Sequence, residues 1–137
     1  MVNEAPVQLL GQLTFNYPTV PSLPQMTVIP SGMNTRGIIL RNAIIVAISS
    51  GGGSTPPMLF ADVNLQQSSA PPPPPLGPSA TMRAILIANP VSGPAGVTAT
   101  NAQLLWPLYL EPGLGLGFNT GSAISGISLY GTFDYVS

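Results

Sequence analysis

The ionisable side chains of this 137-residue chain are few and scattered. Histidine, cysteine and lysine are absent, which excludes zinc centres, thiol nucleophiles, Schiff-base lysines and histidine-dependent triads. What remains is four carboxylates and three guanidinium groups: Glu4, Asp62, Glu111, Asp134, Arg36, Arg41 and Arg83. No two carboxylates are neighbours in the sequence, and no calcium-loop or aspartic-protease signature occurs. We therefore expect no catalytic residue, no cofactor and no metal site, and the sequence predicts that this is not an enzyme.

One further arrangement of acids stays open at this point. A fold could bring Asp62 and Glu111 together, as glycosidases do with carboxylates that are distant in sequence. We expect instead that these two carboxylates lie at solvated strand ends or form surface ion pairs with the arginines.

A glycine-rich segment at residues 113–118 superficially resembles a phosphate-binding loop. The dinucleotide-binding pattern requires a glycine where Phe118 stands, and the Walker loop requires a lysine. We instead interpret the segment as a strand with its glycines on one face and Leu114, Leu116 and Phe118 on the other. The missing side chains would let a neighbouring backbone or sheet approach closely.

Aromatic residues with a polar tip are the remaining candidates for recognition. They include Tyr17, Trp106, Tyr109 and Tyr130. Such residues are favoured at protein interfaces and as platforms for sugar rings. In a small β-domain they are more often core or rim residues, so core packing is the favoured interpretation for Trp106. For Tyr109 and Tyr130, core packing and contact remain equally open.

Strand-length apolar runs separated by Gly, Pro and Ser recur along the chain. Alternation predicts half-buried strands within 7–17, 59–66 and 127–135, whereas 37–48 and 81–89 are rich in Ile and Leu, as expected of strands covered on both sides. Pro107 cannot donate to a sheet, so the strand within 103–111 lies at an edge, is bulged, or is broken in two.

These patterns predict an all-β fold in a single domain over residues 1–137. The expected architecture is a jelly-roll-like β-sandwich of about eight short strands. The alternative is an α+β domain with one short helix. The chain is long enough for one domain with a core and too short for two.

Two proline-rich segments are predicted to be extended. Residues 7–30 read as the first strand followed by an N-terminal arm, which contains Pro21 and Pro24. Residues 68–79 read as a polyproline II loop, which contains Pro72, Pro73 and Pro74. Basic flanks suited to an SH3 ligand are missing, so we interpret this loop as a rigid surface segment or contact arm. These prolines join the four aromatic residues above as predicted interface residues.

Charge is the most unusual property of the composition. Only 5% of residues are charged, against about 25% in typical soluble proteins. The net charge of −1 gives no basic surface for binding the nucleic-acid backbone. No apolar run approaches the ~20 residues that a membrane-spanning helix needs. No secretory signal is evident at the N-terminus of the sequence. We expect synthesis in a cytoplasm and a surface that is largely covered by copies of the chain or by a larger assembly.

The C-terminal residues 110–118, 120–122 and 127–133 resemble the closing strands of small jelly-roll cement (decoration) proteins on tailed-bacteriophage heads. The length, the lack of cysteine and the uncharged composition are similar as well. The resemblance implies a structural protein on the outer surface of the virion. It would bridge capsomers of the major capsid protein of an HK97-type shell, often as a homo-dimer or trimer, and would have no catalytic residues. Two alternatives stay open: a carbohydrate- or receptor-binding virion module, and a jelly-roll capsid protein that assembles alone.

Overall fold

The computed structural model describes residues 11–18, 26–49, 56–65, 81–88, 98–120 and 124–137. Within them lie nine β-strands and a single-turn 3-10 helix, η1, at Ser31–Met33. The strands are β1 Leu13–Tyr17, β2 Met26–Ile29, β3 Ile38–Ser49, β4 Met58–Asp62, β5 Arg83–Ile87, β6 Thr98–Gln103, β7 Leu108–Leu110, β8 Gly115–Asn119 and β9 Ile124–Tyr135. The predicted all-β class is confirmed.

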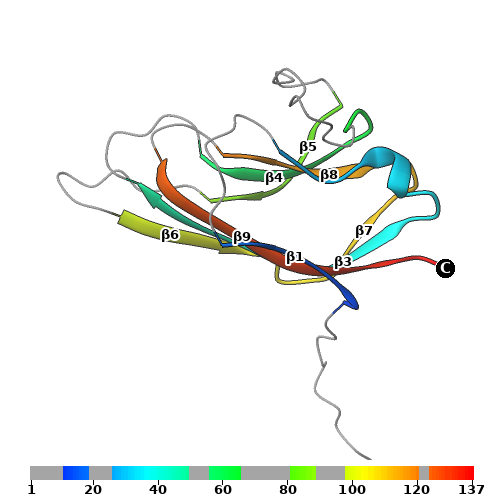
Figure 1. The fold of residues 1–137 in the computed structure, drawn as a ribbon, viewed down its shortest axis with the longest axis horizontal. Coiled ribbons are helices and arrows are strands. Elements are labelled where there is room, and N and C mark those ends of the chain that lie inside the picture. Colours follow the sequence, from blue (N-terminus) through cyan, green and yellow to red (C-terminus); the bar gives the residue numbers. More distant parts are fainter. Residues whose placement is uncertain (1–10, 19–25, 50–55, 66–80, 89–97, 121–123) are drawn as a thin grey trace, which may run out of the picture.

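The strands form two antiparallel sheets that face each other (Figure 1). One sheet has the order β1-β9-β3-β6, with β7 also paired to β3, and the other has the order β2-β8-β4-β5. The pairing is nested, because β1 pairs with β9, β2 with β8, β3 with β6 and β7, and β4 with β5. This is the wrapping of a jelly roll, with β6 and β7 acting as one interrupted strand.

The long strands β3 and β9 form the centre of the five-stranded sheet. Alternate residues of β3, such as Leu40, Ile45 and Ala47, are fully buried against the other sheet. Between Leu40 and Asn42 the register shifts, so that Arg41 is an extra residue in a β-bulge. The opposite face of β3 is only half-buried, so the expectation that this strand is covered on both sides is wrong.

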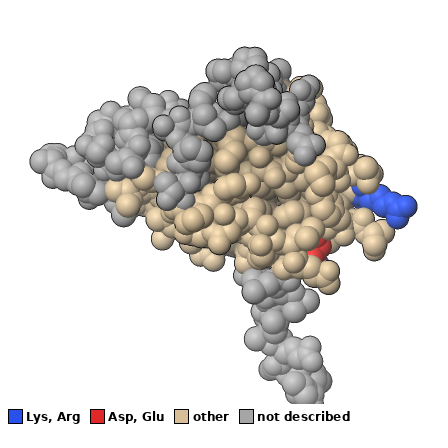
Figure 2. Space-filling view, viewed as in Figure 1, with Lys and Arg blue, Asp and Glu red and all other residues tan. Residues whose placement is uncertain are grey.

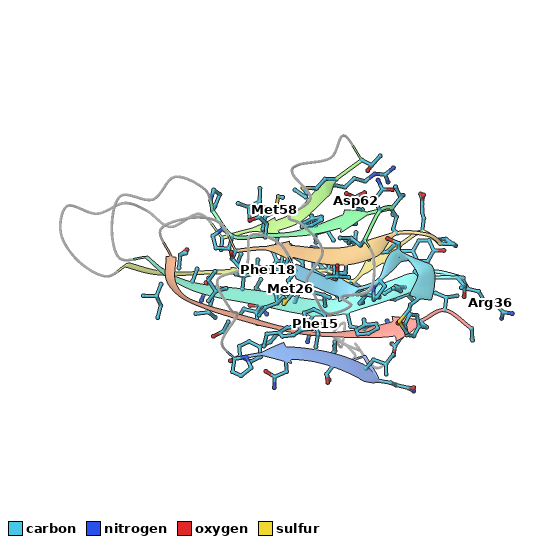
Figure 3. All side chains as sticks on the ribbon, turned by 45° about the horizontal axis from the view of Figure 1, so that its top comes forward. Phe15, Met26, Arg36, Met58, Asp62 and Phe118 are labelled. Carbon is cyan, nitrogen blue, oxygen red and sulfur yellow. The ribbon has the colours of Figure 1, made fainter. Side chains whose placement is uncertain are left out.

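The glycines of β8 have the role expected from their spacing. A Cβ on Gly117 would lie 2.5 Å from Cζ of Phe60, and a Cβ on Gly115 would lie 2.6 Å from the carbonyl oxygen of Ile29. Phe118 points into the space between the sheets, near Met26 (Figure 3), and is fully buried. The segment is therefore a close-packed strand, as the sequence predicted, and no helix follows it within the described residues.

Three other predicted segments, 103–111, 81–89 and the proline-rich arm, can be compared with the strands of the structure. The strand within 103–111 is broken in two and lies at a sheet edge, because β6 ends before Pro107, β7 begins after it, and both pair with β3 alone. The expectation that 81–89 is covered on both sides is wrong, because no residue of β5 is buried and three of its five residues are exposed. β5 pairs only with β4, at the edge of its sheet. Met26–Ile29, expected in the arm, form β2. Residues 7–10, 19–25 and the 68–79 loop lie outside the described residues.

Candidate interaction surface

The face of the five-stranded sheet that points away from the four-stranded sheet, here called the outer face, combines apolar and uncharged polar side chains. In the middle of β3, Ile44 and Val46 are half-buried on this face, and Ile48 is exposed. Tyr130 of β9 lies in register with Ile44 and is exposed by 36%. The outer face is therefore apolar along its central strand and is not covered by any other described element.

A pair of large apolar side chains lies beside this face. Residues 104–107 leave the sheet between β6 and β7, and the Leu104 amide donates a hydrogen bond of 2.9 Å to the Ala43 carbonyl. The next two side chains, Leu105 and Trp106, are exposed by 75% and 74%. We call these two residues the Leu-Trp wedge. Adjacent side chains of this size rarely stay exposed in a protein that functions alone.

The expectation that Trp106 packs in the core is wrong. Pro107 cannot donate a ladder hydrogen bond, and the partner strand β3 carries its bulge between Leu40 and Asn42. The chain therefore leaves the sheet edge for four residues, which places Trp106 outside the space between the sheets. Of the two roles weighed from the sequence, the structure favours contact.

The other predicted aromatic residues have different surroundings. Tyr109 lies opposite Ile39 and is exposed by 53%, and its ring covers Gly37, whose φ of +117° favours glycine. Tyr17 ends β1, where it is half-buried and packs against the core. The structure thus places Tyr109 and Tyr130 on strands of the same sheet, and Trp106 in the connection between two strands of that sheet. Pro21, Pro24, Pro72, Pro73 and Pro74 lie outside the described residues.

A shallow, open hollow of about 390 Å³ lies on the outer face. Its lining comes from β1, β9, β3 and β6: Thr14, Phe15, Asn16, Asn42, Ala43, Ile44, Gln103, Tyr130, Gly131 and Thr132. Every lining residue is uncharged. Thr132 donates to Asn42 Oδ1 at 3.0 Å and accepts from the Gly11 amide at 2.9 Å, which fixes one end of the hollow.

The charges near this face neutralise each other. Arg41 Nε donates to Asp134 Oδ2 at 2.9 Å, and the Gln12 amide donates to Asp134 Oδ1 at 2.7 Å. The hydrogen bond from Gln12, followed by the one from Arg41, lowers the pKa of Asp134 below its usual value. Among the described residues visible in Figure 2, charged side chains appear only toward one end of the molecule.

Two buried polar residues determine the loops at one end of the sandwich, and the sequence singled out neither of them for this role. Asn34, exposed by only 2%, donates to the carbonyl oxygens of Glu111 at 2.8 Å and Leu114 at 2.9 Å and accepts from the Gly37 amide at 2.8 Å. The only sequence signal was an asparagine beside a glycine turn, which is too common to be specific.

Asp62 is the second of these residues. It is 3% exposed and accepts hydrogen bonds from Thr81 Oγ1 at 2.6 Å and the Asn64 amide at 3.2 Å. Its carboxylate thus closes the turn after β4, which is a structural role. Among the described residues, no cluster of three or more acids suited to a metal ion occurs.

Comparison of the chain with protein-family models, curated proteins and solved structures gave no match. In the part of the chain that the structure describes, no helix has the length and hydrophobicity needed to span a membrane.

Proposed function

We propose that this chain is a capsid cement (decoration) protein, which binds the outside of a tailed-bacteriophage head and bridges its capsomers. The observation that supports this most strongly is a jelly-roll domain with 5% charged residues that exposes Leu105 and Trp106 by about three quarters. Such a surface associates readily, because little charge opposes contact. The resemblance of residues 110–118, 120–122 and 127–133 to the closing strands of cement proteins supports the same proposal.

The proposed partner is the major capsid protein of an HK97-type shell. In this proposal the rigid sandwich fixes the spacing between capsomers, and the segments around Pro21, Pro24 and Pro72–Pro74 extend over neighbouring subunits. Proline restricts the free chain, so less conformational entropy is lost on binding than the ~1–2 kcal/mol per residue of an ordinary segment. Because the cement protein would bind the assembled shell and not free capsid subunits, its binding would stabilise the assembled state by mass action. The protein would be made in the host cytoplasm and end on the virion surface.

Titration of empty phage heads with the purified protein, followed by light scattering and co-sedimentation, tests the proposal. We expect saturable binding and a higher temperature of head disruption. With so few ion pairs available, occupancy should barely change between low and moderate salt, and it should stay flat from pH 5 to 8, since no side chain has a reference pKa in that range. No binding to heads, or a steep loss of occupancy with salt, would contradict the proposal.

Exposed aromatic residues also support a second candidate, a carbohydrate- or receptor-binding virion module. Trp106 and Tyr109 are exposed by 74% and 53%, and aromatic faces stack on sugar rings. Binding on a glycan array that Trp106→Ala abolishes and the control Ile87→Ala retains would favour this candidate. Closed particles formed by the purified chain alone would instead indicate a self-assembling capsid protein.

A further inference from the structure

We infer that the outer face is a two-fold homodimer interface, in which the Leu-Trp wedge of each copy enters the hollow of the other. The inference concerns contacts between two copies of the chain and does not depend on the proposed capsid partner. Three observations support it: the relative position of wedge and hollow, the size of the face, and its charge.

The wedge follows closely in the chain on a residue that lines the hollow. Gln103 lines the hollow, and two residues later the chain exposes Leu105 and then Trp106. A two-fold axis between a protrusion and a depression inserts each protrusion into the depression of the other copy and gives a closed pair, whereas a head-to-tail contact gives a ring or an open filament. The axis would pass near Gln103. Each Trp106 would then lie against Ile44 and Tyr130 of the other copy.

The dimensions of the face suit a stable dimer. The five strands of this sheet have 38 residues in total, and at ~3.3 Å along the strand and ~4.8 Å between strands they cover roughly 600 Å², to which the Leu-Trp wedge adds its own exposed area. Each partner in a standard interface contributes about 800 Å². The hollow of about 390 Å³ has room for an indole side chain.

Charge does not oppose this contact. The residues that line the hollow are all uncharged, and Arg41 is paired with Asp134 within the same chain. Two copies related by a two-fold axis bring identical residues together, so an unbalanced charge would repel itself. The polar residues Thr14 and Asn16, on the edge strand β1, supply uncharged hydrogen-bonding groups, as the rim of an interface requires.

Sedimentation velocity of the purified full chain over a range of concentrations tests the inference. We expect a reversible dimer, and we expect Trp106→Ala to raise its dissociation constant at least about 30-fold, the effect of a central hot-spot residue. Ile87→Ala is the matched control, because Ile87 is 50% exposed on the edge strand β5 of the other sheet. A monomer at all concentrations, a trimer, or equal weakening by both substitutions would overturn the inference.

The wild-type protein supplies a readout that needs no substitution. Trp106 is the only tryptophan, so its fluorescence reports whether the wedge is covered. The emission should shift to shorter wavelength, and acrylamide quenching should fall, over the same concentrations at which the dimer forms. A dimer whose tryptophan emission stays that of an exposed indole would show that the wedge lies outside the interface.

Cross-linking tests the position of the axis. The chain has no cysteine, so Gln103→Cys introduces a single thiol that should form a disulfide with the same residue of the second copy on mild oxidation. Ile87→Cys should not. These experiments on the dimer are separate from the head-binding experiment. A protein that is monomeric but binds heads to saturation would overturn this inference alone. A protein that dimerises through the wedge but does not bind heads would overturn the proposed function alone.

Discussion

Replacement of Asn34 by alanine should be among the most destabilising single substitutions in the described part of the sandwich. The side chain is 2% exposed and connects three elements: η1, the start of β3 and the turn between β7 and β8. Its amide nitrogen donates to two carbonyl oxygens of that turn, and its oxygen accepts from the amide that precedes β3. Alanine supplies none of these hydrogen bonds.

The size of the effect follows from the groups left unpaired. Asn34→Ala leaves the Gly37 amide and the Leu114 carbonyl without the partner that Asn34 supplies, whereas the Glu111 carbonyl keeps a hydrogen bond of 3.1 Å from the Leu114 amide. A buried group without a partner loses about 1–3 kcal/mol, and partial access of water to the turn lowers the total below two full penalties. We expect a loss of about 3–5 kcal/mol, a large part of the ~5–15 kcal/mol that stabilises a typical domain.

Urea unfolding followed by circular dichroism measures this loss as a shift in the midpoint at constant slope. Thr35→Ala is the matched control, since Thr35 is the next residue and is exposed, and it should change the free energy of unfolding by less than about 0.5 kcal/mol. Asn34→Asp preserves shape and the acceptor for Gly37 but removes both donors, so at neutral pH it should destabilise at least as much as alanine. A loss below about 1 kcal/mol for Asn34→Ala would refute the reasoning.

Two further outcomes are expected from other sites. Gly117→Ala should lower the free energy of unfolding, measured with urea, by about 1–3 kcal/mol, because its methyl group would meet the Phe60 ring at 2.5 Å. The control Gly126→Ala should be neutral or stabilising, because its methyl group would lie 3.9 Å from Ile48 Cδ1. Equal effects of the two substitutions would argue against close packing at β8. The pKa of Asp134 is lowered in the folded state, so this group stabilises the fold above its unfolded pKa, and the stabilisation is lost as pH falls through its folded pKa. The unfolding temperature should therefore not depend on this group from pH 5 to 8 and should fall below about pH 4. Asp134→Asn should remove that part of the acid dependence.

Much of the fold could be predicted because burial leaves a two-residue period. The alternation at 127–135 and the Ile-rich run at 37–48 correspond to β9 and β3, and the β8 glycines had the expected packing role. Which strands become edges could not be predicted in the same way. For β5, the sequence showed an apolar run, but its place at the end of a sheet is decided by the order of all strands.

The candidate surface was predicted in part. Composition indicated a covered surface and singled out Trp106, Tyr109 and Tyr130, yet it favoured the core for Trp106. The missing information was three-dimensional: the β3 bulge and the break at Pro107 act together to move the chain off the sheet edge. Asn34 was not identified, because its partners in the turn are 76–80 residues away and a single polar residue in a turn carries no spacing signal. Asp62 was considered only as a strand-end, ion-pair or catalytic carboxylate, because its hydrogen-bond partner Thr81 lies 19 residues away.

The nested strand order also constrains how the chain acquires its fold. Both β1 and β3 pair with β9, and β2 pairs with β8, so the early strands wait for partners near the C-terminal end of this sequence. Structures dominated by such distant pairings fold in milliseconds to seconds, more slowly than helical bundles. During translation the apolar strands emerge well before β9 can cover them. Each copy therefore completes its fold only after β9 has left the ribosome, and its exposure to chaperones and to aggregation is concentrated in that interval.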